Sequence, residues 1–446
     1  MAIQKRMEWS KLLSNVRLGD QITQTSNSER TSFLVDYDRI IFSSPFRRLG
    51  KKTQVHPLNT NDHVHTRLTH SLEVASVGRS LGNLCALKVQ GKTDCPKEFI
   101  PEHVGQIVQA ACLGHDIGNP PFGHAGEEAI KSWFSSSENA VLLEHLEETQ
   151  KLDFLNFEGN AQGFRVLTRL EHHRDQGGMR LTCATLAATL KYPWISTYVA
   201  NKKKFCSFLS EKDSLKSVAQ EVGLIQLDDY RYTRHPLAHL VEAADDICYR
   251  ILDLEDAHEM NILSFAEIKK ILGPLCTDKS GLKDICKQKI SDRRKLAYIR
   301  AKAISSAINA VATAFDERYE EIMAGELQDE LISCCDVTTK TQLDEAKDVA
   351  KSRVFHEHRK VEIEIGCYAV IGTLLSAFCY GAKDKCMSNS RVSKYKSERV
   401  ISLLCNDTPI KKGHLYESLL VATDYLSGMT DNYAAHLAKQ LGGMAE

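Results

Sequence analysis

Apolar residues recur at helical spacing along most of this chain, and this pattern limits its possible folds more than any other feature. In residues 100–113, for example, the apolar side chains fall three or four positions apart and would form one stripe along a helix. The other segments with this spacing are 68–87, 236–254, 294–323, 344–378, 398–405 and 415–441. Residues 33–42 are the nearest candidate for a strand. The sequence therefore predicts a mainly α-helical protein.

Size and composition set wide limits on the architecture. A chain of 446 residues could hold two or three average domains or one large helical body, and its 43% hydrophobic residues supply ample core material. The formal net charge of −1 gives no whole-molecule field that would draw the protein to nucleic acid or to a membrane surface.

The cysteines and the N-terminal segment indicate the compartment. None of the fourteen cysteines forms a CxxC pair, and the adjacent Cys334 and Cys335 are awkwardly placed for an ordinary disulfide. We expect most of the cysteines to be reduced and buried. The first 17 residues are charged and lack the apolar run of a secretory signal, and no stretch reads as a membrane span. These features predict a cytoplasmic protein with no membrane partner.

A histidine and an aspartate lie side by side at the end of one apolar segment. His115 and Asp116 follow the expected helix of residues 100–113, and a turn with Gly118 and the Pro120–Pro121 pair comes next. Imidazole and carboxylate are donors for Mg, Mn, Fe, Co or Ni rather than for metals that prefer thiolates. A metal would also justify an aspartate buried at this position. The dipeptide therefore indicates a metal site.

Matching ligands occur on two other expected helices. His70 lies near the start of one helix, and Asp245 interrupts another that is otherwise apolar. Together with His115 and Asp116 they would form a two-His, two-Asp site with positions left open for water and substrate. Each residue taken singly is explained better by a core hydrogen bond or a solvent-facing side chain, so spacing alone does not establish the site.

Six blocks of sequence carry a wider resemblance. They are FRRLGKKTQV at 46–55, TRLTHSLE at 66–73, GHDIGNPPFGH at 114–124, EGNAQ at 158–162, EAADDICY at 242–249 and DYLSGMTD at 424–431. In this order and combination they strongly resemble the deoxyguanosinetriphosphate triphosphohydrolase family. The resemblance extends from about residue 30 to about residue 434, and it is far more specific than an isolated His-Asp pair.

The resemblance implies an all-α fold, with an HD-domain helical bundle core and additional C-terminal helices. It implies that His70, His115, Asp116 and Asp245 hold one divalent metal per subunit, either Mn or Mg or another first-row ion such as Fe, Co or Ni. It also implies three regions. Residues 1–60 would pack on the core and contribute to the substrate pocket, residues 61–260 would form the HD phosphohydrolase core, and residues 261–446 would supply oligomer and pocket contacts.

The activity implied by the resemblance is hydrolysis of a deoxynucleoside triphosphate to deoxynucleoside and tripolyphosphate, with water attacking the α-phosphorus. The 5′-alkoxide is a poor leaving group, so this reaction needs a general acid in addition to a metal. dGTP is a candidate substrate, although the sequence does not establish selectivity for guanine. The family also forms closed homo-oligomers, often hexamers.

His124 and Glu127 match the catalytic pair of the family. His124 lies nine residues after His115 and beyond the Pro–Pro turn, where it can reach the site without being a metal ligand. Glu127 follows three residues later and could orient the imidazole from the same helix. The sequence leaves open whether His124 activates water or protonates the leaving oxygen. On its own, His124 would be read as a loop or helix-cap residue.

Substrate contacts are implied at six positions, namely Arg48, Leu49, Arg67, Asn160, Tyr249 and Asp253. Tyr249 and Asp253 follow Asp245 by four and eight residues, so the three share one helical face. The resemblance implies that Tyr249 packs against the deoxyribose and that Asp253 accepts from the 3′-hydroxyl. Without it, Tyr249 would be read as a core residue and Asp253 as a surface carboxylate.

Other functions stay open at this point. Another HD phosphohydrolase, such as a monophosphatase or cyclic-nucleotide phosphodiesterase, would share the metal ligands but leave the sugar-binding set unexplained. A nucleotide-sensing or single-stranded-DNA-binding protein could use Lys202–Lys204 with Phe205 and Phe208 as a basic stacking patch, although three lysines more often form a solvated loop. Arg359 and Lys360 could bind phosphate or simply be a solvated helix end.

Overall fold

The computed structural model describes residues 6–19, 30–54, 63–171, 178–198, 204–355, 357–387, 394–404 and 410–443. Within these ranges the chain is predominantly helical, and its single sheet is the short antiparallel pair of β1 (Gln226–Asp228) and β2 (Arg231–Tyr232). The predicted all-α class is confirmed.

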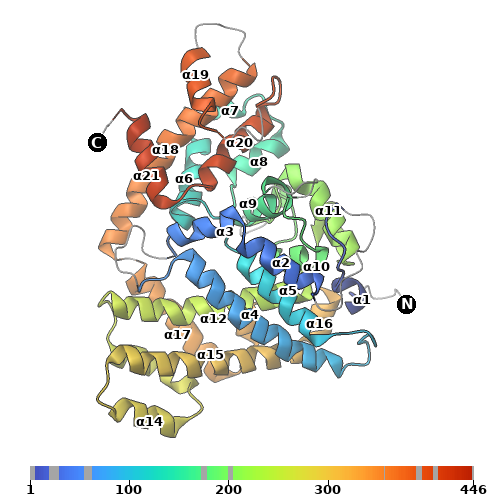
Figure 1. Cartoon of the computed structure of the whole chain (residues 1–446), viewed down its shortest axis with the longest axis vertical. Helices are drawn as coiled ribbons and strands as arrows, with labels where there is room; N and C mark the ends of the chain where they lie inside the picture. The colour runs from blue at the N-terminus through green and yellow to red at the C-terminus, as the bar shows by residue number, and fades with distance from the viewer. Residues whose placement is uncertain are drawn as a thin grey trace.

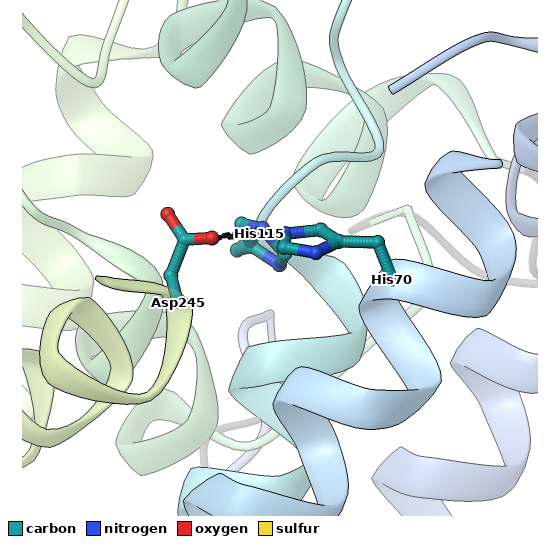
Figure 2. A group of neighbouring side chains, drawn as sticks. All are labelled: His70, His115 and Asp245. Atoms are coloured by element: carbon teal, nitrogen blue, oxygen red, sulfur yellow. Dashed lines mark hydrogen bonds and ion pairs between the residues drawn. The ribbon is translucent and has the colours of Figure 1, made fainter. Parts of the chain in front are cut away.

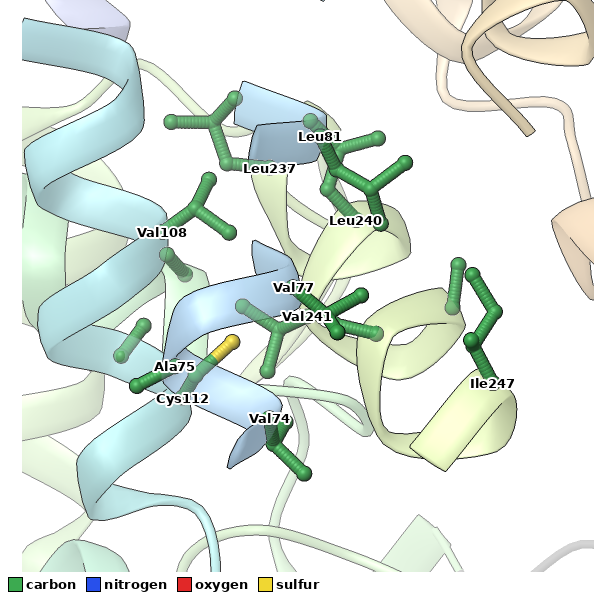
Figure 3. Close-up of a cluster of buried hydrophobic side chains, with 14 of the residues drawn as sticks. Val74, Ala75, Val77, Leu81, Val108, Cys112, Leu237, Leu240, Val241 and Ile247 are labelled. Carbon is green, nitrogen blue, oxygen red and sulfur yellow. The ribbon is translucent and has the colours of Figure 1, made fainter. Parts of the chain in front are cut away.

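Three long helices pack together to form the first hydrophobic core, in the lower half of Figure 1: α4 (Arg67–Gln90), α5 (Pro101–Gly114) and α12 (Pro236–Glu259). Helices α4 and α5 come close because Gly82 faces Gly105, and a Cβ on Gly82 would lie 2.8 Å from the Gly105 Cα. Apolar side chains from all three helices meet in this core (Figure 3). The long helix α15 (Asp292–Glu317) packs on α4 and α12.

A second hydrophobic core surrounds α18 (His358–Met387), in the upper half of Figure 1. The helices packed against α18 are α6 (Gly123–Ser135), α19 (Lys394–Ile401), α20 (Leu415–Ser427) and α21 (Asp431–Leu441). Ile371, Leu374 and Phe378 of α18 are completely buried there.

Helix α18 corrects one expectation about the sequence. Among the described residues, Lys360–Met387 is the one helix long and apolar enough to cross a membrane by length and composition, with a mean hydropathy of 1.6 in its 18-residue apolar window. The expectation that no stretch reads as a span was therefore wrong. The core helix of a water-soluble protein meets the same criterion, and 44% of the apolar window of α18 is buried in the second core.

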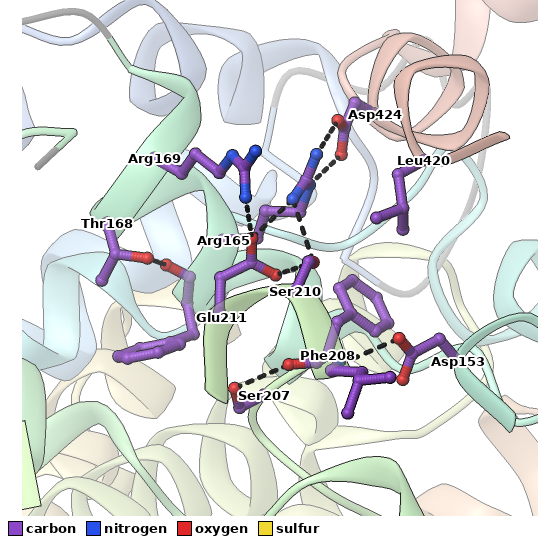
Figure 4. A network of polar contacts seen from close by, with 12 residues as sticks. Asp153, Arg165, Thr168, Arg169, Ser207, Phe208, Ser210, Glu211, Leu420 and Asp424 are labelled. Atoms are coloured by element: carbon purple, nitrogen blue, oxygen red, sulfur yellow. Dashed lines mark hydrogen bonds and ion pairs between the residues drawn. The ribbon is translucent and has the colours of Figure 1, made fainter. Parts of the chain in front are cut away.

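A buried ion network joins the end of α9 (Gly159–Arg165) to Glu211 and to Asp424 of α20 (Figure 4). Arg165 is the last residue of α9. Its Nε and Nη2 donate to the two carboxylate oxygens of Asp424 on α20, and both hydrogen bonds are 2.8 Å long. Its Nη1 donates to Glu211 at 2.5 Å. Since the Arg165 side chain is only 3% exposed, these acceptors satisfy a charge that has little access to water.

The segment predicted as a strand is a helix, α2 (Ser32–Ile41). The Thr31 side chain caps it by accepting from the Leu34 amide, and the buried residues Phe33 and Ile40 lie seven positions apart, or two helical turns. Helix α2 packs on α5, so burial on one helical face outweighed the strand-like composition.

Three long helical segments were predicted correctly in type but not in continuity. Residues 294–323 divide into α15 and α16 (Tyr319–Ala324), and residues 415–441 divide into α20 and α21. Residues 344–378 span the end of α17 (Val337–Val349), a π-helical turn η7 (Ala350–Val354) and the start of α18.

The remaining α-helices are α1 (Trp9–Leu12), α3 (Ser44–Arg48), α7 (Ala140–Leu143), α8 (Glu148–Leu155), α10 (Cys183–Thr189), α11 (Lys212–Glu221), α13 (Phe265–Leu272) and α14 (Lys279–Lys287). The other short helical turns are η1 (Leu49–Lys51), η2 (Val166–Leu170), η3 (Ser196–Tyr198), η4 (Leu209–Glu211), η5 (Gly273–Leu275) and η6 (Leu331–Cys334).

Candidate active site

Three side chains from the three core helices converge at one point (Figure 2). His70 lies in the first turns of α4, Asp245 in the middle of α12, and His115 directly after α5. The Asp245 Oδ1 atom lies 2.9 Å from His70 Nε2 and 3.6 Å from His115 Nε2. One ligand atom of each residue lies within 4.8 Å of those of the other two.

Local structure explains why the two histidines point inward. The Thr66 side chain caps α4 by accepting from the Thr69 amide, which fixes His70 one turn inside the helix. His115 Nδ1 lies 2.6 Å from the Cys112 carbonyl oxygen, so this nitrogen is the donor and Nε2 is left facing Asp245. Burial lowers the pKa of His115, but the Asp116 and Asp245 carboxylates outweigh it and raise that pKa to about 9.

The donor set fits a divalent metal ion. Two imidazole nitrogens and one carboxylate oxygen converge, which is a combination that Mn, Fe, Co and Ni accept. Asp116 lies next to this group, with Oδ1 3.7 Å from His115 Nε2. Its carboxylate already accepts from the Arg67 guanidinium at 2.6 Å and from the side-chain amide of Asn119 at 2.5 Å. The geometry thus groups three of the four predicted ligands, and a ligand role for Asp116 stays a prediction.

His124 and Glu127 form a close pair at the start of α6. His124 Nδ1 lies 3.1 Å from Glu127 Oε2, and Glu127 is held from behind by the Gly159 amide, which donates to Oε1 at 2.8 Å. The His124 side chain is 84% exposed, whereas that of Glu127 is 3% exposed. A buried acid therefore orients an accessible imidazole, an arrangement in which the imidazole could exchange a proton with a bound molecule.

The charges around this pair determine its protonation. Burial would raise the pKa of Glu127, but the hydrogen bond and charge of His124, together with the Lys204 ammonium, lower it to about 2. The hydrogen bond to Glu127 and its negative charge raise the pKa of His124. The pair consequently favours a protonated imidazole beside an ionised carboxylate.

One cavity of about 430 Å³ connects the metal-binding group with the His124–Glu127 pair. This volume is within the usual range for a small-molecule site. Three of the six predicted substrate residues line it, namely Arg67, Asn160 and Tyr249. The Tyr249 ring lies 6.0 Å from that of Phe355, which follows the π-helical turn η7, and the two rings form an apolar part of the wall.

The other three predicted substrate residues do not line this cavity. Arg48 lines a separate cavity of about 420 Å³, and Leu49 is completely buried in the first core. Asp253 is 4% exposed and lies one helical turn past Tyr249, where burial raises the pKa of its carboxyl well above the usual range. Their roles in binding substrate stay predictions.

Several cavity residues were not assigned from the sequence. They include Gln54, Asn119, Lys191, Tyr192, Lys204, Glu242 and Phe355. Gln54 and Asn119 belong to the blocks that carry the family resemblance, which was the available signal. Lys191 carried none, and Lys204 was singled out only as part of the possible basic patch, because the place of both side chains depends on the tertiary fold. Lys360, which could also have been a solvated helix end, lines the cavity as well.

The basic stacking patch considered above is not formed as predicted. Phe205 is completely buried and Phe208 is 1% exposed, both in the second core, so neither ring can stack on a base. Lys204 lies in the cavity wall and pairs with Glu158 at 2.7 Å, while Lys202 and Lys203 are outside the described residues.

Known proteins match this sequence over nearly its whole length. The HD domain family matches residues 67–260, which begin with α4 and end with α12. A deoxyguanosinetriphosphate triphosphohydrolase-like protein of Pseudomonas aeruginosa is 44% identical, with 98% of this chain and 99% of the relative covered. The chain belongs to the deoxyguanosinetriphosphate triphosphohydrolase family.

Two further members of the deoxyguanosinetriphosphate triphosphohydrolase family show the range of similarity. A deoxyguanosinetriphosphate triphosphohydrolase-like protein of Synechocystis sp. is 40% identical over 98% of this chain and 100% of its own length. A protein of Cronobacter sakazakii named deoxyguanosinetriphosphate triphosphohydrolase is 31% identical over 90% of this chain and 92% of its own length. Family membership and the HD domain support a nucleotide triphosphohydrolase, and the group of His70, His115 and Asp245 is compatible with the divalent metal that HD domains bind.

Proposed function

We propose that this protein hydrolyses deoxynucleoside triphosphates to deoxynucleoside and tripolyphosphate. The observation that carries the proposal is the single cavity in which a metal-binding group, a His–Glu pair and several cations face one another. Arg67, Lys191, Lys204 and Lys360 all line this cavity. Three of them pair with acids in or beside the cavity, and a divalent ion bound to the carboxylates would leave these cations to face a chain of phosphates.

The proposed reaction forms a bond between a water oxygen and the α-phosphorus and breaks the bond from that phosphorus to the nucleoside O5′. A divalent ion at His70, His115 and Asp245 would supply positive charge against phosphoryl oxygens and lower the pKa of a bound water. His124, kept protonated by Glu127, would donate its proton to O5′ as that oxygen leaves. The attacking water would lose a proton to solvent, and solvent would reprotonate His124 for the next turnover. Tripolyphosphate then leaves as one unit because no bond between phosphates is broken.

The apolar wall supports a deoxyribose in this site. Tyr249 lies one turn after Asp245 on α12, and its ring faces Phe355. A 2′-hydroxyl placed against these rings would lose its hydrogen bonds to water without gaining an equivalent partner. A ribonucleotide should therefore be a poorer substrate than the corresponding deoxynucleotide.

Product analysis tests this function directly. The purified protein is incubated with Mn²⁺ or Mg²⁺ and each of the four dNTPs, with the four rNTPs as matched controls and with a chelator as a blank. We expect deoxynucleoside and intact tripolyphosphate from dNTPs, and little product from rNTPs. Pyrophosphate or orthophosphate as the first product would contradict attack at the α-phosphorus and favour another HD phosphohydrolase activity. The predicted homo-oligomer, such as a hexamer, is measured on the same preparation by light scattering.

A further inference from the structure

A carboxylate beyond the HD domain contacts the turn that carries His124. Asp431, the first residue of α21, is 2% exposed. Its Oδ1 accepts a hydrogen bond of 3.0 Å from the Phe122 amide, two residues before His124. Its Oδ2 accepts from the Thr53 amide at 3.0 Å and from the Thr53 hydroxyl at 2.8 Å. One buried side chain thus joins three distant parts of the chain.

The turn held by Asp431 has an unusual backbone. Phe122 and Gly123 both have left-handed conformations, with φ of 64° and 58°. For a phenylalanine this region is strained, and such a conformation persists only where its surroundings enforce it. Gly123 also allows Arg67 to approach, since a Cβ there would lie 2.4 Å from Arg67 Nη2. The direction in which His124 leaves the turn depends on these two residues.

Lys52 reinforces the same junction through two further hydrogen bonds. Its Nζ donates to the backbone carbonyl oxygens of Asn119 and Ser427, and both hydrogen bonds are 2.6 Å long. Asn119 precedes the left-handed turn, and Ser427 ends α20 just before Asp431. Lys52 is 3% exposed, so these contacts take place away from water. The segment Lys52–Thr53 therefore lies between the His124 turn and the α20–α21 junction and contacts both.

We propose that Asp431 is a positioning residue for the reaction: its hydrogen bond to Phe122 holds the left-handed turn that aims His124 at the leaving oxygen. This inference rests on the proposed function. Asp431 does not line the substrate cavity, so it acts through the turn and not on the substrate. Without its acceptor, the Phe122 amide would be buried and unpaired, and the strained turn would relax.

The test compares Asp431→Asn with a matched control, Glu417→Gln. The first variant keeps the shape of the side chain but replaces one of its two accepting oxygens with an NH2 donor, so the Phe122 amide and the Thr53 donors can no longer both be satisfied. The control removes the same charge from the exposed first turn of α20. We expect Asp431→Asn to lower kcat about 10- to 100-fold, the effect of a small misplacement of a catalytic group, with KM and Mn²⁺ affinity unchanged. Glu417→Gln should match the wild type in every measurement.

Hydrogen exchange supplies a readout that needs no activity. We expect the amides of Asn119, Phe122, Gly123 and His124 to exchange at least 10-fold faster in Asp431→Asn than in the wild type, while amides within α4 keep their rates; Pro120 and Pro121 have no amide hydrogen to report. Unchanged exchange in this segment, or a rise in KM equal to the fall in kcat, would overturn the inference. If Asp431→Asn does not fold, Asp431→Glu keeps the charge and carries the same test.

The two proposals fail in different ways. A wild-type protein that releases no tripolyphosphate would contradict the proposed function, whatever the exchange rates in residues 119–124. The role of Asp431 alone would be contradicted if the wild type is active and Asp431→Asn changes neither the kcat of the enzyme nor the amide exchange of the turn.

Discussion

At the scale of single residues, the site separates side chains that would hold a metal from side chains that would move a proton. His115 lies in the metal-binding group, whereas His124 opens into the cavity beside Glu127. We expect His115→Ala to lose Mn²⁺ binding and activity together. His124→Ala should keep Mn²⁺ affinity but lose about 10²–10⁴-fold in kcat, the usual contribution of a general acid or base. Calorimetric Mn²⁺ titration and steady-state kinetics check both, and normal turnover by His124→Ala would contradict its role.

The pH dependence of kcat reports the charge of His124. Glu127 raises the pKa of His124, and its own pKa of about 2 keeps it ionised across the neutral range. If His124 donates a proton, kcat falls as pH rises through the pKa of His124. Glu127→Gln removes the hydrogen-bonded negative charge, so this pKa decreases and the falling limb of the profile should move to lower pH. A limb that stays in place or moves to higher pH would show that another group titrates there.

At the scale of elements, the metal-site turn and α9 pack without space for a side chain. A Cβ on Gly118 would lie 2.0 Å from the Gly163 amide nitrogen and 2.3 Å from the Gly159 carbonyl oxygen. Both are backbone atoms, so α9 would have to shift. We expect Gly118→Ala to lower the free energy of unfolding by about 1–3 kcal/mol or more.

The same substitution on α18 is the matched control. Gly366 lies inside α18 on an exposed face, and nothing lies within 4 Å of the Cβ that alanine would add. Gly366→Ala should therefore raise the free energy of unfolding by about 0.5–1 kcal/mol, because alanine has less conformational entropy to lose in a helix. Urea denaturation measures both variants, and equal effects would contradict the packing argument at Gly118.

At the scale of the whole molecule, the Arg165 network ties the HD domain to the C-terminal helices. Arg165→Met would leave Asp424 and Glu211 without the cation that both of them contact. We expect the free energy of unfolding to fall by about 3–5 kcal/mol, the cost of breaking a buried ion pair by removing one partner. Denaturant titration followed by circular dichroism measures this change.

An exposed ion pair provides the comparison. Arg353 pairs with Glu267 at 2.5 Å, but both side chains are more than 40% exposed. Water and salt compensate for the loss of such a pair, so Arg353→Met should leave the denaturation midpoint close to that of the wild type. A similar loss in the two variants would show that the Arg165 network has no special role in joining the two parts of the chain.

The sequence by itself determined the helical class, and its resemblance to the family predicted that His70, His115 and Asp245 come together. Helical spacing predicted α4, α5 and α12 because each has a face that must be buried, and this requirement is written in consecutive residues. Local chemistry also marked the ends of helices, such as Gly118 and the Pro120–Pro121 pair after α5. Residues 33–42 were misjudged because a short apolar run suits a strand or a helix, and packing against α5 decided the outcome.

Only the tertiary structure decided which other side chains reach the site. Lys191 lines the cavity beside Glu242 of α12, and Lys204 lines it beside Glu127 and Glu158. Arg48 and Leu49 lie outside it although they belong to the same sequence block as Gln54. Asp431 reaches Phe122 across 309 residues of chain. No local pattern encodes such a contact, because it depends on how two hydrophobic cores settle against each other once their helices have formed.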